Sequence, residues 1–170
     1  DGAGIALQAG HYRGAVWGLA QSTLNPHFVT TGDDRMIRLW DLSAHKCVAA
    51  AKLPSVSRCA AYSPDMCSIA VGTGGRLKNG RPAKFDGAFV VVDAETLAVT
   101  HRGQDASQPI TDIRYSPDGL TLAVACADSC VYLYDVALKY SLRVKCEGHH
   151  GSVTHVDFSA DSTWLQSTST

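Results

Sequence analysis

One sequence pattern recurs along this chain. Residues 21–41 match residues 115–135 without a gap, so the members of each matched pair are 94 residues apart. Two further copies of the pattern begin near Tyr62 and Phe158. The two matched stretches close with an aromatic residue followed by Asp, and repeats of about 40–50 residues with this ending are typical of β-propeller blades. The repeat therefore predicts an all-β protein with four-stranded antiparallel blades.

The copies divide the chain into successive blades. Turn sequences such as SPDG at 116–119 separate apolar stretches, which favours short strands joined by tight turns. We expect one propeller segment over residues 1–170, divided into the outer strand of a preceding blade at 1–9, whole blades at 10–53, 54–103 and 104–147, and the first half of a further blade at 148–170. A closed propeller has about 4–8 blades. We therefore expect a partial propeller, about three and a half blades of a larger protein.

Charge and hydropathy narrow the range of partners. The chain is 45% hydrophobic and has a formal net charge of −1, a near-neutral balance that disfavours a nucleic-acid-binding surface over the whole domain. No apolar run approaches the roughly 18 residues that a membrane span requires. We expect a cytoplasmic protein that binds other proteins and neither nucleic acid nor membrane.

The cysteines and histidines form no recognisable metal-binding pattern. The six cysteines include no Cys-x-x-Cys pair, and most lie in apolar stretches, where thiols behave as small core residues. His149, His150 and His155 are close in sequence, but no acid or cysteine completes a ligand set. We predict unpaired cysteines, no metal and no cofactor.

A hydroxyl, a histidine and an acid in the first blade invite comparison with a hydrolase triad. His11, Thr30, Asp34 and Trp40 are the residues concerned. In propeller repeats of the Gly-His…Trp-Asp type, such residues instead form a structural hydrogen-bond network, which satisfies buried polar groups. We favour the structural role, predict no catalytic residue, and assign the same role to Asp128 and His149 in the later repeats.

The second blade carries a basic insertion at 74–87. Asp93 follows Tyr62 by 31 residues, whereas Asp135 follows Tyr115 by 20. The insertion resembles a phosphate-binding loop in its glycines and cations, but no Gly-Lys-Ser/Thr follows, so we do not predict a nucleotide site. Its cations, opposed only by Asp86, are Arg76, Lys78, Arg81 and Lys84. They form either a binding element for an acidic partner or a solvated hairpin tip.

Trp17 lies at the start of the first strand of the first blade. A tryptophan at this position belongs either to the core between blades or to the propeller rim. Of the two, we favour the core.

The amino-acid motifs within the repeats resemble those of a known family. The propeller is of the WD40 type, and its motifs together look like the echinoderm microtubule-associated protein-like family. These motifs are AVWGLA at 15–20, VDAET at 92–96, IRYSPDG at 113–119 with LAV at 122–124, VYLY at 131–134 with KYS at 139–141, CEGH at 146–149 with VTHVDFS at 153–159, and LQS at 165–167. The resemblance covers nearly the whole chain.

The resemblance implies a tandem pair of atypical propellers that binds tubulin, decorates microtubules and has no enzymatic activity. We therefore expect a non-catalytic scaffold of the cytoplasm and cytoskeleton, with the cilium or axoneme as one location. A general WD40 adaptor that assembles a signalling or ubiquitin-ligase complex is the alternative. A propeller that is accessory to a catalytic domain is a third.

Overall fold

The computed structural model describes residues 10–11, 14–75 and 84–170, and every regular element in these ranges is a β-strand. This confirms the all-β, partial-propeller fold that the repeats predict. The outer strand expected at residues 1–9 lies outside the described residues. Across the described ranges, the structure contains no helix of the length and apolar character that crossing a bilayer requires.

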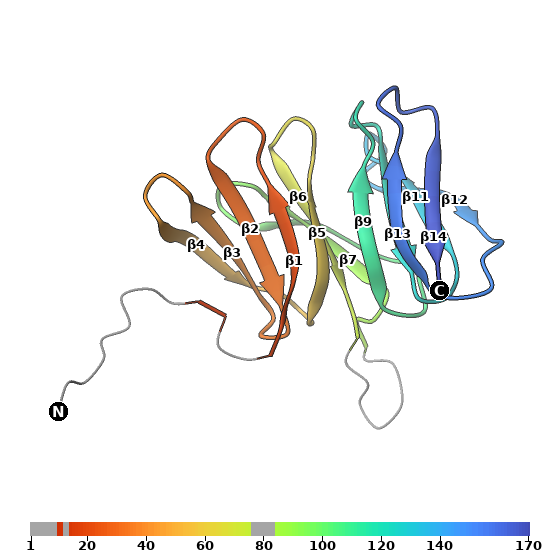
Figure 1. Cartoon of the computed structure of the whole chain (residues 1–170), viewed down its shortest axis with the longest axis horizontal. Helices are drawn as coiled ribbons and strands as arrows, with labels where there is room; N and C mark the ends of the chain where they lie inside the picture. Colours follow the sequence, from red (N-terminus) through yellow and green to blue (C-terminus); the bar gives the residue numbers. More distant parts are fainter. Residues whose placement is uncertain (1–9, 12–13, 76–83) are drawn as a thin grey trace.

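The strands form three four-stranded antiparallel sheets and one two-stranded sheet, each in chain order from the inner to the outer strand (Figure 1). Blade one comprises β1 (Val16–Gln21), β2 (His27–Gly32), β3 (Met36–Asp41) and β4 (Lys46–Lys52). Blade two comprises β5 (Ser57–Tyr62), β6 (Ser68–Thr73), β7 (Ala88–Asp93) and β8 (Val99–Gln104). Blade three comprises β9 (Ile110–Tyr115), β10 (Thr121–Cys126), β11 (Val131–Asp135) and β12 (Ser141–Cys146). The last pair is β13 (Val153–Phe158) with β14 (Leu165–Ser169).

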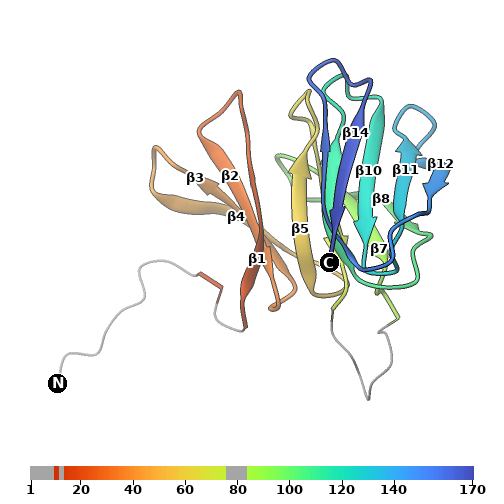
Figure 2. The same cartoon turned by 45° about the vertical axis from the view of Figure 1, so that its right-hand side comes forward.

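The first strands of successive sheets lie beside one another. β1 contacts β5, β5 contacts β9, and β9 contacts β13, so these inner strands form one row from which the blades fan outward (Figure 2). Turns between the first and second strands, and between the third and fourth, gather at one end of the row. We call it the far end; it lies at the top of Figure 1. The other end, which carries the turns between second and third strands and the insertion, is the insertion end.

Local turn chemistry explains why the strands end where they do. After β9, the hydroxyl of Ser116 donates to the carboxylate of Asp118, which accepts a 3.0 Å hydrogen bond from the backbone N–H of Leu120. Gly119 then adopts φ +75°, a conformation that costs glycine little. The same serine-to-aspartate contact follows β5 and β13, because these repeats share the sequence.

The core lies between neighbouring blades. The second strands β6 and β10 are almost wholly buried because blades cover both of their faces. Blades one and two meet through residues such as Ile37 and Val71, and blades two and three through Phe89 and Tyr134, whose rings lie 4.7 Å apart. Each such side chain contributes about 1.5–3 kcal/mol through removal from water. This packing holds the inner strands, and the side chains at their ends, in fixed positions.

Candidate functional site

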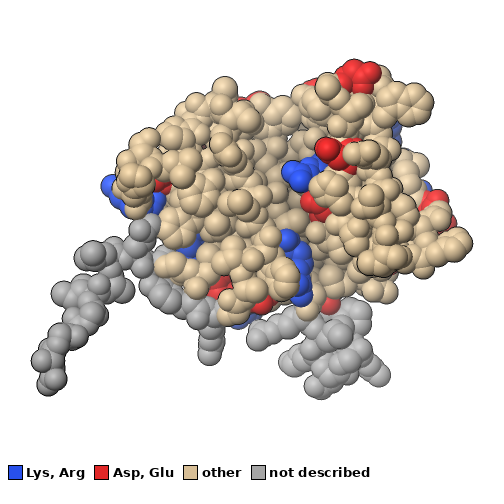
Figure 3. Space-filling view, in the orientation of Figure 1, with Lys and Arg blue, Asp and Glu red and all other residues tan. Residues whose placement is uncertain are grey.

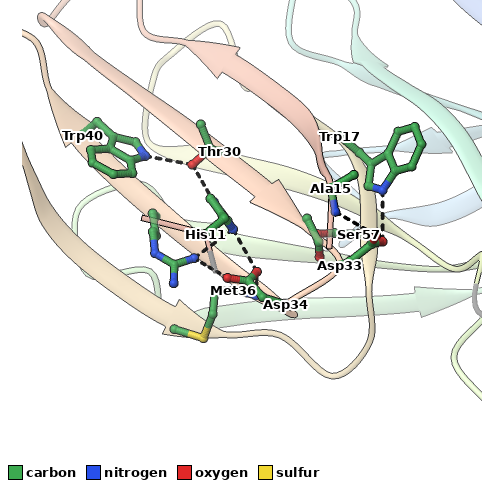
Figure 4. A network of polar contacts seen from close by, with 11 residues as sticks. His11, Ala15, Trp17, Thr30, Asp33, Asp34, Met36, Trp40 and Ser57 are labelled. Atoms are coloured by element: carbon green, nitrogen blue, oxygen red, sulfur yellow. Dashed lines mark hydrogen bonds and ion pairs between the residues drawn. The ribbon is translucent and has the colours of Figure 1, made fainter. Parts of the chain in front are cut away.

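Figure 4 shows the hydrogen-bond network of blade one. The His11 side chain contacts β2 and the turn that follows it, with Nδ1 2.9 Å from Asp34 Oδ1 and Nε2 2.8 Å from Thr30 Oγ1. The indole N–H of Trp40 donates to the same Thr30 oxygen over 2.8 Å. These contacts form a chain when Nδ1 carries the proton: Trp40 donates to Thr30, Thr30 to His11, and His11 to Asp34. The structure thus brings these sequence-selected residues together.

Arg38 completes this network. Its guanidinium donates to Asp34 Oδ2 over 2.7 Å, and the backbone N–H of Met36 donates to Oδ1 over 3.0 Å. The side chains of His11, Asp34 and Arg38 are only 4%, 9% and 10% exposed. Burial alone would raise the pKa of Asp34, but the hydrogen bonds from Arg38 and His11 outweigh it and hold the pKa below its usual value. The sequence did not single out Arg38, although it lies on β3 two residues before Trp40.

In blade three, the positions equivalent to the blade-one network carry different side chains. Asp128, the counterpart of Asp34, accepts from the Tyr132 hydroxyl over 2.8 Å and from the backbone N–H of Ser107 over 3.2 Å. Tyr132 stands 94 residues after Arg38, so a neutral phenol replaces the guanidinium. Burial would raise the pKa of Asp128, but the bond from Tyr132 helps to lower it. This blade keeps an acid at the turn without a histidine partner.

His149 occupies the same place in the last sheet. Its Nε2 lies 2.7 Å from the Ser167 hydroxyl and its Nδ1 lies 3.0 Å from the Ser169 hydroxyl. His155, by contrast, lies 2.6 Å from Asp112 on β9. Within the described ranges, no group of three or more His, Cys, Asp or Glu side chains is arranged to hold a metal ion.

Trp17 is at the surface, so the core interpretation is wrong. It is 51% exposed, its indole N–H donates to Asp33 Oδ1 over 3.0 Å, and the Arg58 guanidinium lies 4.4 Å from its ring centre. The aligned repeats contain the signal that could have shown this. Trp17 is the second residue of its inner strand, and the same position holds Arg58, Thr111 and Thr154 in the next strands. Polar residues at three of four equivalent positions indicate a solvent-facing site.

These four positions border an open groove of about 390 Å³ at the insertion end. We call it the rim groove; its lining includes Trp17, Arg58, Gly75, Pro109, Thr111 and Thr154. Figure 3 looks onto the row of inner strands, where Lys and Arg atoms lie beside Asp and Glu atoms in the middle of the view. The rim groove is the place where the inner strands and the base of the insertion meet.

The base of the insertion is anchored to blade two. The Thr73 hydroxyl lies 2.7 Å from the carbonyl oxygen of Phe85, and the Gln104 side chain donates to the carbonyl oxygen of Lys84 over 3.0 Å. Lys84 is exposed, with its ammonium 5.7 Å from the Phe85 ring centre. The other three cations of the insertion, Arg76, Lys78 and Arg81, lie outside the described residues.

The two ends differ in charge. The far end carries mainly carboxylates at its turns: Asp41, Asp65, Asp93, Glu95, Asp118, Asp135 and Asp161, with Lys46 and Lys139 as its lysines. At the insertion end, several carboxylates are already paired within the fold, as Asp34 is with Arg38 and Glu147 with Lys145. The insertion end is therefore the better of the two for an acidic partner.

Residues 16–170 match the family model described as the echinoderm microtubule-associated protein second beta-propeller. The chain belongs to the echinoderm microtubule-associated protein-like family. It is 37% identical to the 77 kDa echinoderm microtubule-associated protein of Strongylocentrotus purpuratus, and 33% identical to echinoderm microtubule-associated protein-like 1 of Rattus norvegicus and to echinoderm microtubule-associated protein-like 3 of Homo sapiens.

Each of these alignments extends over 157 residues and covers 91% of this chain. They cover 21%, 18% and 16% of the three relatives, respectively, so the chain spans about a fifth of their length. The family that the repeat motifs indicate is thereby confirmed, and the match extends over all four sheets of the structure.

Proposed function

We propose that this chain is part of a non-catalytic scaffold that associates with microtubules through tubulin. The observation that carries the proposal is the match of residues 16–170 to a propeller of a family whose members are named microtubule-associated proteins. We propose the same location for it, the cytoskeleton of the cytoplasm, including the microtubules of cilia. The interblade core supports this role, because packed sheets present their rim side chains with little freedom to move.

We further propose that the insertion end faces the microtubule. The far end is predominantly acidic at its turns, so an acidic protein surface would be repelled there. The sequence of the insertion contains Arg76, Lys78, Arg81 and Lys84, and the described residues at its base, among them Lys84, lie at the opposite end. Charges at the rim of an interface act mainly on the association rate and its salt dependence, and each cation contributes about 0–1 kcal/mol. The four together would therefore contribute at most about 4 kcal/mol, and less as the salt concentration rises.

Co-sedimentation with microtubules across a salt series tests the proposal. The intact protein should bind, and replacement of the four insertion cations by Ser should weaken binding and flatten its salt dependence. A matched variant that removes four cations away from the insertion end controls for total charge: Lys46, Arg114, Lys139 and Arg143. It should bind as the unmodified protein does.

Two results would count against the proposal, and they differ in meaning. No sedimentation of the intact protein would exclude microtubule association and favour the adaptor role. If the insertion variant binds microtubules with the same affinity and salt dependence as the unmodified protein, the insertion is a solvated tip and the contact lies on another face.

A further inference from the structure

The rim groove has a fixed aromatic floor. Trp17 is 51% exposed, yet its indole is held on two sides: Asp33 accepts its N–H at 3.0 Å and Arg58 stacks on its ring at 4.4 Å. A stacked guanidinium and an anchored N–H restrict the ring to one orientation before any partner binds. An exposed, immobilised tryptophan of this kind is what protein interfaces use as an anchor, since little side-chain entropy remains to be lost.

Arg58 supplies the charge of the groove. Its Nε and Nη2 atoms donate to the carbonyl oxygens of Gly74 and Gly75 at 3.2 and 3.1 Å, which fixes the plane of the guanidinium. Its Nη1 amino group has no hydrogen-bond acceptor among the described residues. No carboxylate in the described ranges forms an ion pair with Arg58, and the nearby Asp33 accepts the indole N–H of Trp17.

The rest of the groove is neutral. The Thr111 hydroxyl donates to the carbonyl oxygen of Val153, and the Thr154 hydroxyl lies 3.0 Å from that of Thr168. Pro109 and Ile110 add apolar surface. Of the described residues that line the groove, Arg58 alone is charged. Arg58 thus offers one amino group without an acceptor among the described residues, and it lies beside the apolar ring of Trp17. This pair of groups is complementary to a ligand that has one carboxylate next to an apolar side chain.

We propose that the rim groove is a docking site for an acidic peptide segment of a partner protein. A side-chain carboxylate of the peptide pairs with the Nη1 group of Arg58, and the neighbouring apolar side chain packs on Trp17 and Pro109. A basic peptide is disfavoured, because Arg58 already occupies one face of the indole and Asp33 is engaged by the indole N–H. The inference does not depend on microtubule association, since it requires only an acidic segment.

Fluorescence anisotropy on the intact protein tests this site. The probe is a short labelled peptide of alternating Glu and Leu with both termini blocked; the same peptide with Lys in place of Glu is its charge-reversed control. The Glu peptide should bind and the Lys peptide should not. Arg58→Gln should weaken Glu-peptide binding by roughly tenfold, the effect of losing a charge-assisted hydrogen bond. Arg143→Gln, on the exposed outer strand β12, should leave it unchanged.

Because Arg58 also donates to two backbone carbonyl oxygens, its replacement could disturb the local structure, so a second variant tests the site with Arg58 in place. Thr154→Glu keeps Arg58 in place but puts a carboxylate on the groove wall, so it should weaken the Glu peptide about as much. Thr154→Gln, of similar size, should not. Equal binding of the Lys peptide, binding only when the peptide has a free C-terminus, or Glu-peptide affinity that neither Arg58→Gln nor Thr154→Glu reduces would each overturn the proposal.

Discussion

Replacing Asp34 by Ala removes the acceptor at the centre of the blade-one network. The carboxylate accepts from His11, from Arg38 and from the backbone N–H of Met36, at 2.9, 2.7 and 3.0 Å. Without it, the Arg38 charge and the His11 N–H lose their acceptor in a site where both side chains are at most 10% exposed. We expect blade one to lose stability while the other blades keep theirs.

The magnitude follows from burial. Removing one partner of a buried charge pair costs about 3–5 kcal/mol. Arg38 retains some contact with solvent, so we place Asp34→Ala near the lower bound, at about 3 kcal/mol. Asp34→Asn keeps an oxygen acceptor for His11 but loses the negative charge opposite Arg38, so it should cost about half as much.

Native-state hydrogen exchange followed by mass spectrometry measures the effect within the intact protein. A loss of about 3 kcal/mol corresponds to roughly hundredfold faster exchange of the most protected amides of β2 and β3. Glu95→Ala, at an exposed turn of blade two, is the control and should change protection by less than about 0.5 kcal/mol. Unchanged protection in Asp34→Ala would refute the reasoning, because the network would then contribute nothing to folding.

The same variant has a defined pH dependence. The pKa of Asp34 is lowered in the folded protein, so its contribution is complete above the unfolded-state value of about 3.9 and is lost as the pH falls toward the folded-state pKa. The stability difference between the unmodified protein and Asp34→Ala should therefore be constant near neutral pH and should narrow below about pH 4. A difference that widens in acid would contradict the sign of this argument.

Two further predictions concern packing and thiol chemistry. Gly103→Ala puts a methyl group 2.3 Å from the buried Phe89 ring, so it should destabilise blade two by about 1–3 kcal/mol, measured by chemical denaturation; unchanged stability would show that the ring can move aside. In the native protein, a thiol reagent should label the exposed Cys67 and Cys146 quickly and the buried Cys59 and Cys126 slowly, because burial raises the pKa of both buried thiols; equal labelling rates would contradict the packing.

The fold could be predicted from the sequence because its signal is repeated. The same Ser-x-Asp turn follows the first strand in blades two and three and in the last sheet, and the continuous apolar stretches of β6 and β10 match their burial on both faces. A single copy of either signal would be ambiguous, but agreement between copies at a fixed offset excludes most other arrangements.

The surface features were harder to predict because they depend on contacts between repeats. The indole of Trp17 is 51% exposed, and its contacts are with Asp33 in the turn after β2 and with Arg58 in the next blade. Arg38 was missed for a different reason: its role depends on its distance to Asp34 across a turn within one blade, which a sequence pattern does not encode. The repeats do carry a signal for the exposure of Trp17, because the second residue of the next three inner strands is polar: Arg58, Thr111 and Thr154.

Cross-linking on microtubules tests most directly the central claim, that an acidic partner meets the insertion end. A zero-length reagent that joins lysines to carboxylates would be applied to the intact protein bound to microtubules, and the cross-linked peptides identified by mass spectrometry. The account predicts links to tubulin from Lys84, in the insertion, and none from Lys46 or Lys139 at the far end. Links from Lys46 and Lys139 without any from Lys84 would contradict it.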